Sequence, residues 1–341
     1  MIENIKYITY QSFPSNKANT IQTFDNIKYM CRKVNKVELI FPLREKTSSD
    51  NRKKLAKYYF LPDNLRVKAR KHPYPFGKLK YFEKISYTIS HFLWSRKECK
   101  KYSEINNLNT IFFTRSDWVF YNLSKKNLNV TFECHQLSKI RILNIKRSLK
   151  FKNSKIIFLN ENLANDSGID FGDKKKIISI QNGVDPELFS KNIDKKIGQL
   201  IFIGNLKRFN ESRNLKFVID CFNNIKLNDK YVLKIIGGPT SEVDKLKEYI
   251  SKIGLQNKVF IEDRIDRNLA IKEIQKSEIG LLINSSSNEH STKYTSPLKY
   301  FEYIHGGLKV LAVDFESHRV LPFSDYIKFF KENDEESFVD Q

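Results

Sequence analysis

Short apolar runs of strand length alternate with segments of helical periodicity along most of the chain. In the first half, Ile5–Tyr10 and Val37–Pro42 are apolar runs, and Asn19–Val34 between them repeats apolar residues at helical spacing. A strand, a helix and a second strand in this order predict a βαβ unit with parallel strands. Further apolar runs in this half predict strands at 110–115, 130–135, 155–160 and 176–181.

The same alternation restarts in the second half of the chain. It predicts strands at 199–205, 231–238, 258–263, 279–285 and 308–314, and helices at 214–225, 241–254, 267–277 and within Tyr294–Gly307. Two successive α/β domains with parallel sheets follow from this order. We place the boundary in Gln181–Gly198, which gives an N-terminal domain of residues 1–183 and a C-terminal domain of residues 184–341.

The helix within Tyr294–Gly307 has recognisable signals at both ends. Ser296 is a favoured N-cap residue, and Pro297 fits the first helical position, where no N–H donor is needed. Gly306–Gly307 can end the helix in the left-handed conformation. The backbone amides of Leu298 and Lys299 then lie at a helix N-terminus, where unpaired donors and the helix dipole favour an anion such as phosphate.

Length and cysteine content restrict the class of protein. At 341 residues the chain is long enough for two domains that each bury a core, and its four cysteines are scattered without a C-x-x-C pair. The N-terminus does not resemble a signal peptide, and no apolar run approaches the ~18 residues of a membrane span. We therefore expect a cytoplasmic protein with reduced thiols, without a zinc cluster or a disulfide framework.

The formal charge of +21 favours anionic partners such as nucleic acid, anionic lipid or phosphorylated ligands. Lysine and arginine are concentrated in Arg66–Lys101, where aromatic residues are interleaved with them. This composition suits a segment that contacts a membrane surface, at the inner face of the plasma membrane for a cytoplasmic protein. A solvated helix whose aromatic residues pack into the core explains the same pattern, and nucleic-acid binding is a third interpretation.

Three stretches resemble motifs of GT-B fold glycosyltransferases, most similar to family 4 of the retaining, nucleotide-sugar-dependent enzymes. Gln181–Phe189 resembles the turn between the two domains of those enzymes. Ser296–Asp314 resembles their donor-binding helix and the strand after it, and Phe132–Leu137 resembles a strand end that presents a histidine. The three stretches occur in the family's order and spacing and are spread over most of the chain.

The resemblance implies two Rossmann-like parallel-sheet domains that face a cleft, with the acceptor bound by the first domain and the nucleotide-sugar donor by the second. It implies that Glu302 accepts hydrogen bonds from the ribose hydroxyls and that His135 approaches the transferred sugar. The helix-end amides of Leu298 and Lys299, next to Ser296 and Pro297, would meet the diphosphate, whose charge increases as the sugar bond breaks. The implied reaction is hexosyl transfer to a glycan or lipid-linked acceptor in cell-surface polysaccharide or glycoconjugate synthesis.

The chain departs from the family pattern at two places in the expected site. Tyr294 stands where many members carry a second glutamate, and Glu289 in the same loop is the candidate to replace that carboxylate. A glycine-rich turn after the first strand is missing, and the residues in its place suggest contacts on the acceptor side. The candidates there are Ser15, Asn16 and Lys17, of which Lys17 can contact a phosphate.

Cations for the diphosphate are expected after the first strand of the second domain, next to Gly204. The loop there is longer than in the family, and counting back from the following helix places Arg213 where the family has a lysine. Lys207 or Arg208 can supply a further charge. Planar Arg binds two phosphate oxygens at once, so this replacement is chemically sensible.

We expect neither a metal nor another cofactor, because no Asp-x-Asp loop and no His/Cys cluster with ligand spacing is present. Retention without an evident nucleophile fits front-face departure of the leaving group, as the family is described. Two other functions stay open: a nucleotide-sugar epimerase or hydrolase of the same fold, and a non-catalytic binder of anionic polymer or membrane. The family's final helix, which crosses back to the first domain, is expected to be missing after Tyr326.

Overall fold

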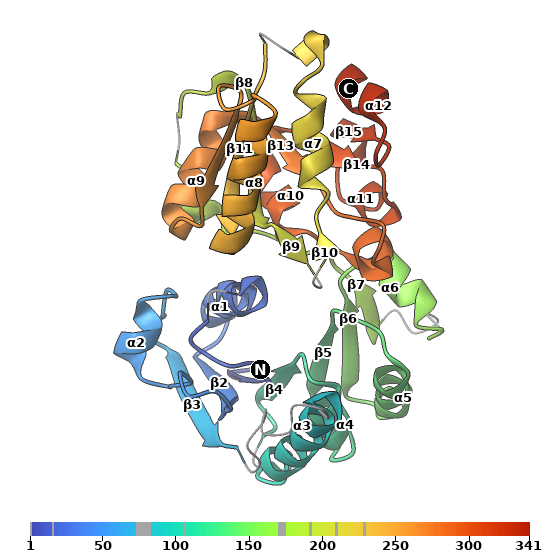
Figure 1. Cartoon of the computed structure of the whole chain (residues 1–341). Helices are drawn as coiled ribbons and strands as arrows, with labels where there is room; N and C mark the ends of the chain where they lie inside the picture. Colours follow the sequence, from blue (N-terminus) through green and yellow to red (C-terminus); the bar gives the residue numbers. More distant parts are fainter. Residues whose placement is uncertain are drawn as a thin grey trace. The chain divides into compact units, whose positions relative to one another are not determined.

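The computed structural model describes the chain in two compact units, Met1–Ile180 and Gln181–Gln341. Its description leaves out residues 1, 16, 73–82, 105–106, 170–174, 191–192, 209–210 and 228–229, and of Lys84 and Arg208 it gives the backbone alone. Each unit is built on one main parallel sheet with helices packed against it (Figure 1). The predicted fold class, two Rossmann-like parallel-sheet domains, is confirmed.

The sheet of unit 1 has the order β3-β2-β1-β4-β5-β6-β7. Its strands are β1 (Asn4–Ile8), β2 (Lys36–Leu43), β3 (Leu65–Lys71), β4 (Thr110–Thr114), β5 (Val130–Cys134), β6 (Ser154–Phe158) and β7 (Ile177–Ser179). Its helices are α1 (Ala18–Cys31), α2 (Arg52–Ala56), α3 (Glu83–Cys99), α4 (Asp117–Ser124), α5 (Lys139–Ser148) and α6 (Glu161–Asp166). Apolar residues of α1, β1 and β2 form a buried cluster that includes Tyr7, Phe24 and Leu39.

The basic segment Arg66–Lys101 is a strand followed by a helix, so the interpretation of the whole segment as a solvated helix is wrong for its first residues. Leu65–Lys71 pairs with β2 as the edge strand β3, and α3 packs beside α4. The aromatic ring of Trp94 is buried, as the core interpretation expects. Residues 73–82 of this segment lie outside the described residues.

Unit 2 has a sheet of order β12-β11-β8-β13-β14-β15 and a two-stranded hairpin of β9 and β10. The strands are β8 (Lys196–Asn205), β9 (Lys207–Arg208), β10 (Glu211–Ser212), β11 (Val232–Gly238), β12 (Val259–Asp263), β13 (Ser277–Leu282), β14 (Lys309–Val313) and β15 (Ile327–Phe330). The helices are α7 (Leu215–Cys221), α8 (Thr240–Lys252), α9 (Arg267–Lys276), α10 (Leu298–His305), α11 (Glu316–Arg319) and α12 (Glu335–Asp340). Short helical turns lie at η2 (Pro186–Leu188), η3 (Ile225–Leu227), η4 (His290–Tyr294) and η5 (Ser324–Tyr326).

Successive side chains of these strands point to opposite faces, and each face has its own core. On one face, Phe202 and Leu281 pack with residues of α7, α8 and α12. On the other face, Ile203 and Leu282 pack with residues of α9 and α10. Among the helices of the described residues, none is long and apolar enough to cross a bilayer.

Helix α10 is fixed to its sheet by the side chain of Tyr303. The ring is fully buried and lies so close to Gly280 of β13 that a Cβ atom there would be 2.4 Å from two ring carbons. The Ile203 amide donates to the Tyr303 hydroxyl (3.3 Å), which donates to the Leu281 carbonyl (3.4 Å). Tyr303 therefore bridges β8 and β13 just beyond their last backbone pair, Gly280 with Ile201.

The N-terminal end of α10 differs from the prediction, and its C-terminal end matches it. The helix starts at Leu298, and the Ser296 hydroxyl accepts from the Asn182 amide (2.9 Å) instead of capping the helix. The predicted N-cap role of Ser296 is therefore wrong. At the other end Gly307 has φ +73°, and its amide and that of Leu308 bond back to the last turn in a Schellman motif, as predicted.

The last residues belong to unit 2. Asp334 caps α12, because its carboxylate accepts from the Ser337 amide (2.9 Å). The Phe338 side chain is buried in the core beside α7. The acidic helix start that the sequence predicts at Asp334–Glu336 is confirmed, and the strand β15 before it was not predicted.

Gly280→Ala should destabilise unit 2 by about 3 kcal/mol, because the new Cβ must displace a ring that two hydrogen bonds hold in place. Urea unfolding of the full chain measures the change. Gly183→Ala is the matched control, since a Cβ at Gly183 meets no heavy atom within 4 Å. Equal stability of the two variants would contradict the close packing of Tyr303 on Gly280.

Candidate functional site

The strand order of unit 2 reverses between β8 and β13, the point at which open α/β sheets bind ligands beyond their carboxyl ends. From β8 the chain winds outward through β11 and β12, then returns to add β13, β14 and β15 on the other side. The N-terminus of α10 follows β13 at this edge, and the Tyr303 bridge lies under it. The predicted donor residues can be placed relative to this point.

Gly204 and α10 meet at the end of β8. Gly204 has φ +148°, a conformation that only glycine adopts easily, and a Cβ there would lie 3.9 Å from Cε of Lys299. Lys299 Nζ is 2.5 Å from the carboxylate of Glu302, one turn further into the helix. Glu302 is buried and Lys299 is half-buried. Because Lys299 lies next to Gly204 at the end of β8, this ion pair is at the carboxyl edge of the sheet, beside the first turn of α10.

Arg213 is the predicted phosphate-binding residue on the connection between β10 and α7. Its guanidinium lies over the ring of Phe202 in β8 (5.9 Å), and Nη1 is 3.5 Å from the carbonyl of Ile283. Burial lowers the pKa of Arg213, a shift that Tyr303 opposes. Nε has no hydrogen-bond partner among the described residues. Arg213 is thus a positively charged hydrogen-bond donor at the switch point, and no carboxylate pairs with it among the residues that the structure describes.

Two residues at this edge were missed by the sequence analysis. Asn284 follows β13, is buried, and its Oδ1 has no partner among the residues that the structure describes. Arg264 follows β12, and its guanidinium bonds to Asn205 at the end of β8. Their only signal was position, because each comes shortly after a predicted strand whose carboxyl end faces the site.

The other predicted cations are placed differently. Lys207 bonds to Glu242 in the first turn of α8 (2.9 Å), so its charge is already balanced. The side chain of Arg208 lies outside the described residues. Of the predicted donor-site residues, the contacts above bring together Gly204, Lys299 and Glu302, while Arg213 contacts Phe202 of β8 and the carbonyl of Ile283 after β13.

The candidate replacement for the missing family glutamate is exposed. Glu289 precedes the π-helical turn η4 and pairs with Lys293 (3.4 Å). Tyr294 is half-buried at the end of η4, with its ring 6.1 Å from that of His290. No contact of Glu289 with α10 is found among the described residues.

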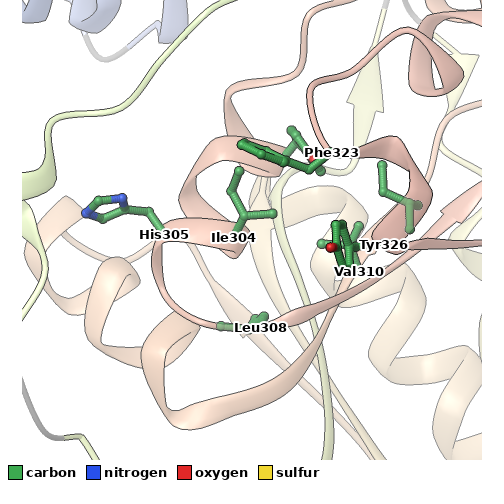
Figure 2. Close-up of a pocket in the computed structure, with 8 residues that line it drawn as sticks. Ile304, His305, Leu308, Val310, Phe323 and Tyr326 are labelled. Atoms are coloured by element: carbon green, nitrogen blue, oxygen red, sulfur yellow. The ribbon is translucent and has the colours of Figure 1, made fainter.

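A pocket of about 350 Å³ lies at the opposite end of α10 (Figure 2). Its lining residues are Tyr300, Ile304, His305, Leu308, Val310, Phe323, Tyr326 and Ile327. They come from the C-terminal turns of α10 and from the starts of β14 and β15, which is the amino edge of the sheet. The pocket is therefore separate from the switch point, and it holds none of the predicted donor residues.

In unit 1, His135 belongs to a buried charged group. It follows β5, and its Nε2 is 2.8 Å from a carboxylate oxygen of Glu133. Arg115, after β4, donates two hydrogen bonds to the same carboxylate (2.9 and 3.1 Å) and two more to Asn19 and Thr23 of α1. The Arg115 and Glu133 side chains are buried, whereas that of His135 is 27% exposed.

This arrangement fixes the charge state of the group. Burial alone would raise the pKa of Glu133, but the charge of Arg115 and the hydrogen bond from His135 outweigh it and lower the pKa to about 2. Burial and Arg115 lower the pKa of His135, although Glu133 opposes them. His135 is therefore neutral near pH 7, and because an ionised carboxylate only accepts, its proton lies on Nε2 and Nδ1 is an acceptor.

The predicted acceptor-side residues lie before α1. The Ser15 amide donates to the Tyr59 hydroxyl (2.7 Å), so this amide is already bonded within unit 1. Lys17 is exposed at the N-cap position of α1, where it can meet a ligand. Asn16 lies outside the described residues.

No protein-family model matches the chain, and no curated protein sequence matches it either. Solved structures match over nearly its whole length. Sucrose-phosphate synthase from Thermosynechococcus elongatus superposes with a TM-score of 0.67 at 12% identity, over 99% of this chain and 88% of that one. HepE from Anabaena, in complex with UDP and glucose, gives a TM-score of 0.62 at 11% identity over 98% and 88%. The lipopolysaccharide outer core galactosyltransferase WaaB gives 0.60 at 14% identity over 99% and 88%.

At these low sequence identities the superpositions show the fold alone, and the shared fold is that of GT-B glycosyltransferases. The fold that the sequence resemblance implied is thereby confirmed for this chain.

Glu133→Gln should flatten the acid dependence of stability. The depressed pKa of Glu133, about 2 against an ordinary 4.5, contributes stability that is complete above about pH 4.5 and is lost as the pH falls towards about 2. The loss amounts to ~3 kcal/mol at ~1.4 kcal/mol per pKa unit. Between about pH 7 and about pH 3, urea unfolding should show roughly 2 kcal/mol of this loss in the parent, because pH 3 lies about 1.5 units below the ordinary pKa, and none of it in the variant.

At neutral pH the same variant should be less stable by about 3–5 kcal/mol, because Arg115 stays buried without its carboxylate. Glu289→Gln, an exposed carboxylate, is the control and should follow the parent at both pH values. A Glu133→Gln protein with the parent's full acid dependence would show that Glu133 is not the group that titrates.

Proposed function

We propose that the chain is a glycosyltransferase that moves a sugar from a nucleotide-diphosphate-sugar to a glycan or lipid-linked acceptor, with retention of the anomeric configuration. The fold shared with sucrose-phosphate synthase, WaaB and HepE supports the reaction class. The observation that carries the proposal is the meeting of the Lys299–Glu302 pair with Gly204 at the switch point of unit 2. We assign the product to cell-surface polysaccharide or glycoconjugate synthesis from the sequence resemblance.

The diphosphate of the donor is matched by cations and amides at this edge. The first amides of α10 have no acceptor within the helix and lie at its positive end. Arg213, Lys299 and Arg264 add three positive side chains from three different elements. The leaving nucleoside diphosphate gains negative charge as the sugar bond breaks, so donors fixed in advance stabilise the transition state more than the ground state.

Glu302 is suited to the ribose. A buried carboxylate accepts hydrogen bonds only, and a ribose offers two neighbouring hydroxyl donors. In the structure one oxygen of Glu302 is held by Lys299. Ribose hydroxyls can share or replace the ammonium contact while Lys299 turns to phosphate.

We assign His135 of unit 1 to a contact with the transferred sugar. Its Nε2 proton is held by Glu133, so the group that it offers is Nδ1, an acceptor for a sugar hydroxyl. Because the imidazole is neutral in this state, it does not repel the positive charge that develops on the sugar. Retention by front-face departure remains an assignment from the family resemblance.

The acceptor assignment is supported by the outer face of α3. Ile85 and Ile89, one helical turn apart, are 58% and 51% exposed, although large apolar residues seldom gain from such exposure. Arg96 and Lys97 follow in the last turn of the same helix. Apolar and basic side chains on one exposed helix suit peripheral contact with an anionic membrane, where a lipid-linked acceptor would be found.

A donor panel tests the proposal against its alternatives. The full chain is screened by thermal shift with UDP-, GDP- and ADP-sugars, starting from UDP-glucose because HepE binds UDP and glucose. The stabilising donor is then incubated alone and with candidate acceptors. Transfer or slow hydrolysis to the nucleoside diphosphate supports the proposal. Formation of an epimerised donor would indicate an epimerase. If no donor stabilises the protein, the proposal is overturned.

Glu302→Ala should weaken donor binding by about 10- to 100-fold, the effect expected for losing hydrogen bonds to a charged acceptor. The fold should survive, because the substitution removes a carboxylate and leaves the Lys299 ammonium free to reach solvent. Calorimetric titration with the donor measures the loss, and Glu248→Ala on the exposed face of α8 is the control. Parent-like affinity in Glu302→Ala would place the ribose elsewhere.

Arg213→Ala should weaken binding of the nucleoside diphosphate by about tenfold or more while changing nucleoside affinity little. The reason is that Arg213 lies between the end of β8 and the end of β13, next to Phe202 and Ile283, and its Nε has no hydrogen-bond partner among the described residues, which suits phosphate. Titrations with both ligands give the ratio directly. Arg319→Ala, an exposed arginine paired with Asp314, is the control. Equal losses for the two ligands would remove the phosphate role.

A further inference from the structure

A second group of polar and aromatic residues lies at the carboxyl edge of the sheet in unit 1, and the proposed function does not use it. Each member follows a strand of the sheet or lies on α3 or α5, the helices beside α4. Tyr10 follows β1, Arg44 follows β2, His72 follows β3, Ser116 follows β4, His91 is on α3 and Arg141 is on α5. The strand order of this sheet also reverses here, between β1 and β4. By the same rule as in unit 2, this edge is a place for a ligand.

Tyr10 is the centre of the group. Its ring stacks on His91, with centroids 4.2 Å apart and planes at 17°. Its hydroxyl lies 2.5 Å from Nε2 of His72 and donates to Ser90 Oγ (3.0 Å). On the other side of the stack, Nε2 of His91 lies 2.6 Å from the Ser116 hydroxyl. These bonds hold the aromatic and imidazole rings in one arrangement, so the group is built before any ligand arrives.

Two guanidinium groups adjoin this stack. That of Arg44 lies 5.1 Å from the centroid of Tyr10 and 5.5 Å from that of Tyr87, with its side chain 13% exposed. Arg44 pairs with the carboxylate of Glu45, which is 43% exposed, at 3.5 Å. An exposed ion pair of this length contributes little to stability.

Arg141 is balanced only in part. Its Nη1 donates to the Gln136 carbonyl (2.7 Å), and its Nε has no hydrogen-bond partner among the described residues. The carboxylate of Asp117 is 3.7 Å from Nε, beyond hydrogen-bond distance, and its other oxygen accepts from Asn144 (2.7 Å). The Arg141 side chain is 24% exposed, so a ligand can reach it.

The effect of these charges is visible on His91, which lies among them. Burial, followed in order by the charges of Arg141, Arg44 and His72, lowers the pKa of His91 to about 3. His91 is therefore neutral, and three positive or protonatable groups surround it. Of the buried carboxylates on the same edge, Glu133 pairs with Arg115, and Asp117 accepts from Asn144 and lies 3.7 Å from Arg141.

We propose that this edge of unit 1 binds a phosphate group of the acceptor, with Arg141 and Arg44 as the binding residues. The identification of the ligand as an acceptor rests on the proposed function, whereas phosphate binding itself does not. Guanidinium groups bind phosphate through two parallel hydrogen bonds, and the neighbouring hydroxyl and imidazole groups supply further donors. The acceptor would thus be a phosphorylated sugar or a lipid-linked phosphate, which share this chemistry.

Histidine resonances of the full chain test phosphate binding directly. Three of the six histidines, at 72, 91 and 135, belong to unit 1, and those at 290, 305 and 318 belong to unit 2. The protein is labelled at histidine and titrated with inorganic phosphate at constant pH and ionic strength, with chloride as the matched salt. We expect saturable shifts of His72 and His91, assigned by single substitutions to Gln. Shifts confined to unit 2 would overturn the proposal, because phosphate then binds only the donor side.

The variants are chosen to separate binding from folding. Arg141→Gln and Arg44→Gln should each raise the apparent Kd for phosphate at His91 by about tenfold or more, while the histidines of unit 2 stay in place as evidence of an intact fold. Arg66→Gln, on the exposed face of β3, is the control and should leave the Kd unchanged. The same Kd in the parent and in a double variant of Arg44 and Arg141 would overturn the assignment.

A second arm identifies the source of the phosphate. Vesicles of phosphatidylcholine with phosphatidic acid are sedimented with the protein, with and without saturating inorganic phosphate. Vesicle binding that phosphate abolishes and that Arg141→Gln weakens supports a lipid-linked phosphate. Phosphate shifts without such vesicle binding support a soluble phosphorylated acceptor. The donor panel on the parent protein is independent of both, so failure of donor binding alone rejects the proposed function and leaves the phosphate site.

Discussion

The donor edge of unit 2 depends on one buried side chain. Tyr303 packs its ring on Gly280 and places its hydroxyl between the Ile203 amide and the Leu281 carbonyl, at the point where β8 and β13 stop pairing. The two strands would otherwise leave these backbone groups buried without partners, at a cost of a few kcal/mol each. The same contact sets the height of α10 above the sheet, and so the position of Lys299 and Glu302. Packing and chemistry therefore cannot be varied independently at this helix.

The two units treat buried charge in different ways. In unit 1 the buried Arg115 is fully engaged by Glu133 and by α1, which makes it part of the scaffold that orients His135. In unit 2 Arg213 adjoins a ring and a distant carbonyl, and no carboxylate pairs with it in the described structure. A buried charge without a partner is costly, and it persists where a ligand supplies the missing charge. This difference separates the structural Arg115 from Arg213, the proposed phosphate ligand, more clearly than sequence position does.

The sequence predicted what local chemistry decides. The βαβ order and the left-handed end of α10 depend on residues close in the chain, and both are confirmed. Ser296 was misassigned because its hydroxyl is taken by Asn182, more than a hundred positions earlier, and no local signal reports such a partner. The strand β3 was missed because basic residues alternate along Leu65–Lys71, which reads as surface, although an edge strand tolerates this composition.

The candidate site was predictable only in part for the same reason. Residues on one helix, such as Lys299 and Glu302, are related by helical spacing that can be read from the sequence. Arg115 and Glu133 meet because β4 and β5 pair in one particular register, which sequence periodicity leaves undetermined. The group around Tyr10 draws on the ends of four strands and on two helices, so it exists only after the whole sheet has formed.

The bond between Asn182 and Ser296 has a consequence for dissecting the protein into its parts. Asn182 donates from its backbone to the Ser296 hydroxyl (2.9 Å) and from its side chain to the Ser296 carbonyl (2.6 Å), while Gln181 donates to the Val320 carbonyl (3.2 Å). A separately expressed unit 2 that began at residue 184 would lose the two bonds to Ser296, just before α10, and the bond to Val320, just after α11. The segment that leads into α10 would then lack its anchor, and a weak result in the proposed nucleotide titrations would be mistaken for a property of the fold. The two residues that look like linker belong, in energetic terms, to the site.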